Sequence, residues 1–132
     1  TLEEITDIVA DYRKAARNAI EAGFDGIEVH AANGYLIDQF LRTGSNLRTD
    51  AYGGSIENRT RFLKEVMTAV CEEVGGPQCA IRISPVTPVN DASDAEPQTL
   101  FEHVAQFLGT LHLAYVHTVE GATGASRDFY QG

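Results

Sequence analysis

Apolar residues recur along this chain with a helical period in three stretches, and short apolar runs separate those stretches. The first stretch begins at Thr1 and Glu4, which have capping-box spacing, and stops near Gly23. The second begins at Ser55 and ends at a Gly-Gly-Pro sequence, and the third begins at Pro97. The positions expected to face the core are Ile5, Ile8, Val9, Tyr12, Ala16, Ala19 and Ile20 in the first, Phe62, Leu63, Val66, Met67, Val70, Cys71 and Val74 in the second, and Leu100, Val104, Phe107 and Leu108 in the third.

The short apolar runs predict three strands, at residues 26–30, 80–84 and 113–119. A short helix is expected at about residues 36–41, and a long polar loop at 86–96. Strands separated by helices favour parallel pairing with right-handed crossovers, so the order predicts an α/β fold. A doubly wound sheet and a section of a barrel both fit. Three strands leave two unpaired edges, so we expect a fold that is incomplete on its own.

Composition and charge narrow the classes of function. The chain has 132 residues, of which 43% are hydrophobic, as expected for one ordinary domain. Because 19 acidic residues outnumber 10 basic ones, giving a net charge of −9, nucleic acid is not an expected partner. No apolar run approaches the ~20 residues that cross a bilayer, and the first residues do not resemble a signal peptide. We therefore expect a soluble protein with no membrane partner.

The two cysteines, Cys71 and Cys79, are too few for a disulfide scaffold and lack the CxxC spacing of a metal site. Free cysteines are often small core residues, and we expect both to be buried. Unpaired thiols favour a reducing compartment, so a cytoplasmic location is expected.

Polar side chains follow the first predicted strand at the point where it ends. The sequence FDGIEVHAANGY at residues 24–35 finishes an apolar run with an imidazole, a carboxamide and a phenol, from His30, Asn33 and Tyr35. Barrel and open-sheet α/β enzymes place their chemistry where the C-terminal ends of strands meet. The sequence therefore predicts a catalytic site at this strand end.

Three motifs, EAGFDGIEVHAANGYLIDQFL, RTDAYGGSIENRTRFLKEV and IRISP, in this order and spacing, resemble the middle of the Old Yellow Enzyme family of flavin-dependent ene-reductases. The sequence YVHTVEG at residues 115–121 is also similar, so the resemblance covers nearly the whole chain. It implies that residues 1–132 form a partial (β/α)₈ TIM barrel, with about three βα units around the fourth to sixth strands. A complete barrel of this kind needs about 250 residues.

The resemblance also implies the chemistry. The reaction would reduce the activated C=C bond of an α,β-unsaturated carbonyl or nitro compound, with FMN as cofactor and NAD(P)H as reductant. His30 and Asn33 would donate hydrogen bonds to the substrate's carbonyl or nitro oxygen, where charge develops as hydride arrives from reduced flavin. Tyr35 would donate the proton to the α-carbon. Arg82 would bind the flavin near N1 and O2 and favour its reduced form.

Other interpretations of these residues stay open. Arg82 could instead be a core arginine paired with Glu28 or Glu120, and Glu28 and His117 are expected to be structural. Glu28, His30 and His117 could converge as the ligands of a metal-dependent barrel hydrolase. No HxH or HExxH pattern supports such a site, so no metal is expected.

The loop at residues 48–54 is as recognisable as the strand end, yet its residue types suggest a structural role. Gly53-Gly54 permits a tight turn before the second long helix. Asp50 is expected to hold the loop by pairing with Arg59 or Arg61.

A different class of function also fits the chain. It could be a non-catalytic barrel fragment or interaction module that pairs with complementary chains, or with itself, through exposed strand edges. The sequence contains no Gly-rich phosphate loop with GxGxxG spacing. We therefore do not expect this chain to bind FMN alone.

Overall fold

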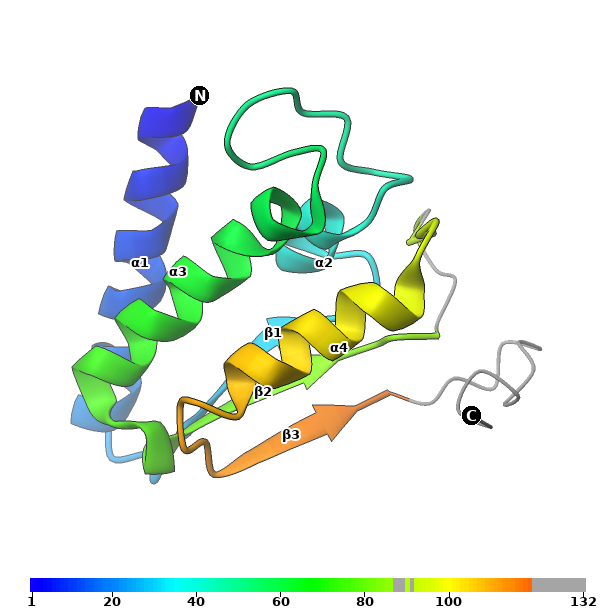
Figure 1. Cartoon of the computed structure of the whole chain (residues 1–132). Coiled ribbons are helices and arrows are strands. Elements are labelled where there is room, and N and C mark those ends of the chain that lie inside the picture. The colour runs from blue at the N-terminus through cyan, green and yellow to red at the C-terminus, as the bar shows by residue number, and fades with distance from the viewer. Residues whose placement is uncertain (87–89, 91, 120–132) are drawn as a thin grey trace.

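Helices and strands alternate along the chain, as the apolar pattern predicted (Figure 1). The computed structural model describes residues 1–86, 90 and 92–119. Part of the predicted loop at 86–96, and the segment after residue 119 with Glu120, lie outside the described residues. The elements in chain order are α1 (Leu2–Glu21), β1 (Ile27–Ala31), α2 (Leu36–Leu41), α3 (Ile56–Val74), the 3-10 helix η1 (Gly76–Gln78), β2 (Cys79–Ile83), α4 (Pro97–Leu108) and β3 (Tyr115–Thr118).

The helices begin at the residues whose local chemistry predicted them. The Thr1 hydroxyl accepts the N–H of Glu4 at 3.2 Å, and the Glu4 side chain bonds back, so the capping box is confirmed. Ser55 caps α3 by accepting the N–H of Asn58 at 3.2 Å, and Pro97 opens α4. No helix among the described residues is both long enough and apolar enough to span a bilayer.

The three strands form one parallel sheet in the order β1-β2-β3. β2 ends one residue earlier than predicted because its partner β1 ends at Ala31, which pairs with Ile83. β3 is shorter than the predicted 113–119, since Leu113 packs against the core from the turn before the strand. The pairing still extends past both ends of β3, where the N–H groups of Ala114 and Val119 donate to the carbonyls of Cys79 and Ile83, each at 2.8 Å.

The helices cover one face of the sheet and leave the other open. Figure 1 shows α1, α3 and α4 on the same side of the strands. Val29, Ile81 and Ile83 point toward these helices and are buried, whereas Glu28 and His30 on alternate positions of β1 are exposed. A doubly wound sheet has helices on both faces, so this arrangement is instead that of a section of a barrel wall. Within the described residues β1 and β3 each pair only with β2, which leaves the two predicted open edges.

The tight turn predicted before α3 is present. A side chain on Gly53 would collide with the backbone carbonyl of Arg48, and Gly54 has a left-handed φ of +84°. Only glycine meets the first requirement, and glycine meets the second without strain. The turn therefore brings the start of α3 against the preceding loop.

The ion pairs of this loop differ from those predicted. Asp50 pairs with Arg48 at 2.6 Å, so its predicted pairing with Arg59 or Arg61 is wrong. Arg59 is buried and instead pairs with Asp94 at 2.7 Å, a residue that follows β2 in the sequence. The nearby Arg48 guanidinium holds the pKa of Asp50 below its usual value.

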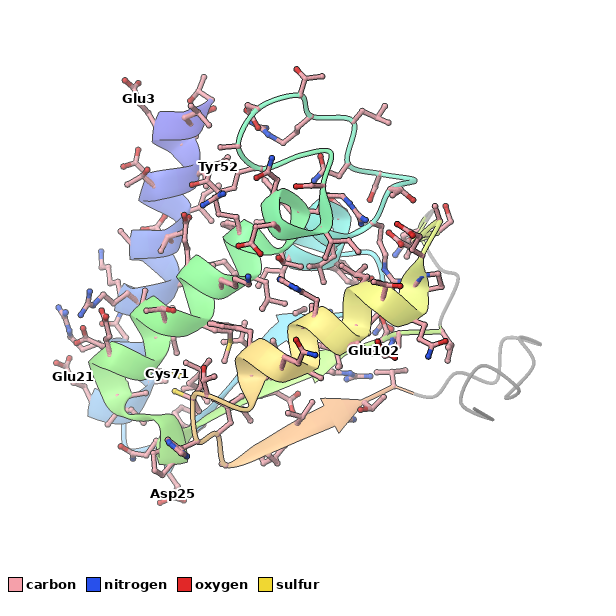
Figure 2. The ribbon with its side chains drawn as sticks, in the orientation of Figure 1. Glu3, Glu21, Asp25, Tyr52, Cys71 and Glu102 are labelled. Carbon is pink, nitrogen blue, oxygen red and sulfur yellow. The ribbon has the colours of Figure 1, made fainter. Side chains whose placement is uncertain are left out.

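Both cysteines contribute to the core, as predicted. Cys79 is fully buried at the start of β2, and Cys71 lies partly buried on α3 (Figure 2). Burial, and then the neighbouring Cys71, raise the pKa of the Cys79 thiol to about 12. Both free cysteines are therefore packing residues, and the Cys79 thiol stays protonated at neutral pH.

Candidate active site

Three side chains form a row across the open face of the sheet. His30 of β1, Arg82 of β2 and His117 of β3 are register partners, so they leave the sheet on the same side. The row lies toward the C-terminal ends of all three strands. This is the edge at which parallel α/β proteins assemble their sites.

Directly after β1 the chain reverses through two left-handed residues, Asn33 at φ 58° and Gly34 at φ 72°. The Asn33 N–H donates to Ser84 Oγ at 2.7 Å, and its carbonyl accepts a hydrogen bond from Asn90 Nδ2 at 2.9 Å. The Gly34 N–H donates to Asp38 Oδ2 at 2.9 Å. Asparagine adopts the left-handed region more readily than most residues, so the turn is fixed without a second glycine.

Tyr35 follows this turn as the residue that precedes α2. Its ring centroid lies 5.2 Å from that of His30, with the two ring planes at 54°. The Tyr35 side chain is 58% exposed on the open side of the sheet, where a ligand could reach it. The structure thus brings His30 and Tyr35 together, with Asn33 in the turn between them, while their catalytic roles remain predictions.

Arg82 stands between the two histidines of the row. Its Nε is buried and has no hydrogen-bond partner among the residues that the structure describes. The alternative pairing of Arg82 with Glu28 is wrong, because the Glu28 carboxylate lies 3.1 Å from His117 Nδ1 instead. Buried guanidinium N–H groups normally have an acceptor. Arg82 is therefore suited to bind a group that brings an acceptor to this face.

A buried ion pair that the sequence analysis did not identify supports the turn. Arg42 Nε donates to Asp38 Oδ1 at 2.8 Å, and both side chains are almost fully buried. The Arg42 guanidinium also donates to the carbonyls of Ser84 at 2.6 Å and Pro85 at 3.3 Å. The spacing of Asp38 and Arg42, four residues apart on a short helix, was the available signal. The pair links the turn after β1 to the end of β2.

The open face also carries a polar cluster formed by Glu28 of β1 with Tyr115 and His117 of β3. His117 and Tyr115 of β3 both interact with the Glu28 carboxylate, and the interaction between Tyr115 and Glu28 raises the pKa of the Tyr115 phenol. Among residues 1–86, 90 and 92–119, no group of three or more His, Cys, Asp or Glu side chains is placed to hold a metal ion. Glu28, His30 and His117 therefore do not form the ligand set of a hydrolase.

Comparisons with known proteins agree with this arrangement. The family model described as NADH:flavin oxidoreductase / NADH oxidase matches residues 1–131. A relative from Leishmania infantum, named "Probable flavin mononucleotide-dependent alkene reductase", is 51% identical over 138 residues, which cover 98% of this chain and 38% of that protein. The 12-oxophytodienoate reductase 2 of Arabidopsis thaliana is 47% identical over 120 residues, covering 91% of this chain and 32% of that protein.

Solved structures show the same relationship in three dimensions. An Old Yellow Enzyme homologue from Zymomonas mobilis superimposes with a TM-score of 0.89 at 42% identity, over 96% of this chain and 37% of its own. Morphinone reductase in complex with tetrahydroNAD gives a TM-score of 0.91 at 46% identity, over 99% of this chain and 36% of its own. The chain thus spans little more than a third of these relatives. It belongs to the Old Yellow Enzyme family of flavin oxidoreductases and forms one section of their barrel.

Proposed function

We propose that this chain supplies the oxygen-binding and proton-donating wall of an FMN-dependent ene-reductase. Its substrate would be the activated C=C bond of an α,β-unsaturated carbonyl or nitro compound, and NAD(P)H would be the reductant. The observation that carries this proposal is the contact of the His30 and Tyr35 rings, 5.2 Å apart, at the C-terminal end of β1. Because the chain spans 38% of an alkene reductase, the activity would belong to a complete barrel that contains it.

The residues present fit a flavin on the open face. The buried Arg82 Nε lacks a hydrogen-bond partner within the described part of the chain, and the guanidinium is a permanent cation with several donors. N1 and O2 of a flavin ring are acceptors on which negative charge gathers when the ring is reduced, so Arg82 would hold this edge. When bound, reduced FMN supplies the hydride that adds to the β-carbon of the alkene.

His30 and Asn33 would bind the oxygen of the substrate's activating group. Negative charge develops on that oxygen as the β-carbon is reduced, so donors placed there stabilise the transition state more than the ground state. The hydrogen bond to Ser84 fixes the backbone of Asn33, and the Tyr35 ring packs on His30. These contacts support the proposal, because they hold the Asn33 backbone and the His30 ring in place before a substrate binds.

Tyr35 would transfer its proton to the α-carbon. A phenol has an ordinary pKa of about 10, so it carries its proton at neutral pH and can act as a general acid toward a carbanion-like centre. Its exposed position beside His30 supports this role.

The proposal is tested by FMN titration and by cyclohexenone reduction with NADPH, in the complete polypeptide and in this chain alone. We expect the complete polypeptide to bind FMN and turn over, and this chain alone to do neither. His30→Leu should weaken binding of the saturated analogue cyclohexanone roughly tenfold, since one hydrogen bond is lost. The control His112→Asn changes an exposed histidine in the turn before β3 and should leave this binding unchanged. No FMN binding by the complete polypeptide would refute the proposal.

The alternative, an interaction module, is favoured by one observation. All four residues of β3 are exposed, and Tyr115 and Val116 among them are large and apolar. An open strand edge with such residues can pair with another chain. Sedimentation of this chain would show association in that case, and a complete polypeptide that associates but never binds flavin would favour the module.

The cellular location is a proposal of the same kind. Both cysteines are free, which suits a reducing compartment such as the cytoplasm. Localisation of the tagged complete polypeptide by microscopy, in cells that express it natively, tests this directly. Secretion, or retention in an oxidising compartment, would contradict it.

A further inference from the structure

Arg82 has a carboxylate neighbour with which it does not pair. Glu28 on β1 is in register with Ala80, so it lies diagonally across from Arg82, two residues further along β2. Both side chains leave the sheet on its open face. With parallel strands about 4.8 Å apart and a rise of about 3.3 Å per residue, such diagonal neighbours are about 8 Å apart, within reach of side chains as long as glutamate and arginine. An ion pair between them would be expected, yet none forms.

Glu28 turns instead across β2 toward β3. Its carboxylate oxygen lies 3.1 Å from His117 Nδ1. The crossing is open because Ala80, which lies between Glu28 and Tyr115 in the register, has only a methyl group on this face. Ala80 is nonetheless 1% exposed, so the neighbouring side chains cover it.

We propose that His117 is a positioning residue that holds the Glu28 carboxylate away from Arg82, so that no carboxylate offsets the guanidinium charge and its Nε–H stays free for the bound flavin. This inference rests on the proposed function of Arg82. In this role His117 acts through Glu28, and it neither packs in the core nor contacts the flavin.

The His117 imidazole keeps the Glu28 carboxylate near β3. His117 Nδ1 faces a carboxylate oxygen that can only accept, so Nδ1 carries the proton. That N–H is present in one neutral tautomer and also in the cation, so the hydrogen bond to Glu28 does not require a charged histidine. The Tyr115 phenol also interacts with this carboxylate, and the interaction raises the pKa of the phenol. Without the His117 donor, Glu28 would pair with Arg82, the cation on the same face of the neighbouring strand.

Three variants of the complete polypeptide test the inference through FMN affinity. His117→Leu removes the donor, so Glu28 pairs with Arg82 and FMN should bind roughly tenfold more weakly. Adding Glu28→Gln to this variant should restore the affinity, because no carboxylate is left to neutralise Arg82. His117→Asn keeps a donor near the position of Nδ1 and should bind FMN like the unaltered protein. Failure of Glu28→Gln to rescue His117→Leu would overturn the inference.

A second measurement does not depend on the flavin. In the FMN-free polypeptide, the Nε–H resonance of Arg82 should shift in His117→Leu and return in the double variant. An unchanged resonance in folded His117→Leu overturns the inference. If His117→Leu does not fold, the FMN affinity of the single variant Glu28→Gln is the test. This affinity should be retained, and a tenfold loss would contradict the inference by showing that Glu28 itself supports FMN binding.

The same data separate this inference from the proposed function. If Arg82→Gln leaves FMN affinity unchanged, while the Arg82 resonance shifts as expected in His117→Leu, then the flavin role of Arg82 is wrong. The inference that His117 keeps Glu28 from pairing with Arg82 would still be supported in that case.

Discussion

The backbone N–H of Asn33, just after β1, donates to the hydroxyl of Ser84, just after β2, across 2.7 Å. The two residues are 51 positions apart in the chain. Their bond joins the turn that presents the candidate catalytic groups to the strand that carries Arg82. The shape of the site therefore depends on a residue that has no part in the proposed chemistry.

Replacing Ser84 with alanine tests this dependence. The change leaves the Asn33 N–H without its acceptor, so the free energy of unfolding should fall by about 1–3 kcal/mol. Urea denaturation measures this loss. Ser45→Ala is the control, because the Ser45 hydroxyl also makes a hydrogen bond with the backbone, donating to the Gln39 carbonyl, but on the exposed surface. Equal losses in the two variants would contradict the role assigned to Ser84.

The buried pair of Asp38 and Arg42 should have a larger effect. Asp38→Asn leaves the Arg42 guanidinium buried without its counter-charge, and we expect a loss of about 3–5 kcal/mol in the free energy of unfolding. Asp50→Asn breaks the partly exposed pair with Arg48 and should cost at most about 1 kcal/mol. Thermal or urea unfolding of both variants measures the difference, and a small effect of Asp38→Asn would show that the pair does not hold the turn.

Tyr35→Phe should separate the two halves of the proposed reaction. The variant lacks the proton donor, so substrate reduction should slow by about 100-fold or more, while flavin reduction by NADPH is spared. Stopped-flow measurement of each half-reaction in the complete polypeptide checks this. Tyr52→Phe, in the loop before α3, is the control and should affect neither half. An equal loss in both halves for Tyr35→Phe would count against its role as the acid.

A carboxylate at the α1–α3 interface predicts how stability depends on pH. The guanidinium groups of Arg17 and Arg13, at 2.5 Å and 2.8 Å, lower the pKa of Glu73 to about 2. Because the folded pKa lies below the ordinary value, Glu73 stabilises the fold above pH 4.5 or so, and this contribution is lost as the pH falls through about 2.

The measurement is the melting temperature between pH 2 and pH 6. Glu73→Gln should lower the melting temperature at pH 6 and flatten its fall with acid. Glu72→Gln is the control, since Glu72 is more exposed and lies 3.7 Å from Arg13. Parallel curves of melting temperature against pH for the native chain and Glu73→Gln would show that the ion pairs of Glu73 do not set this pH dependence.

Features set by neighbouring residues could be predicted from the sequence. The capping box of Thr1 and Glu4 and the cap at Ser55 depend on residues three positions apart, so the helix starts were correct. The placement of His30 and Tyr35 at one strand end followed from the alternation along β1 and the turn after it.

Features set by distant residues could not be predicted. Arg59 pairs with Asp94, which is 35 positions away in the chain. Asp50 was expected to pair with Arg59 because the two are close in sequence, but it pairs with Arg48. The pairing of Glu28 with His117 spans 89 positions and three strands. Both depend on which strands become neighbours and in which register, and a single sequence does not report this.

The bonds that shape the turn between β1 and α2 have a consequence for barrel evolution. Among the described residues, the side-chain hydrogen bonds that hold this turn join residues between Asn33 and Asn90, so one contiguous stretch of polypeptide encodes both the turn and its scaffold. Recombination between related barrels with crossover points outside that stretch would move it as a single cassette.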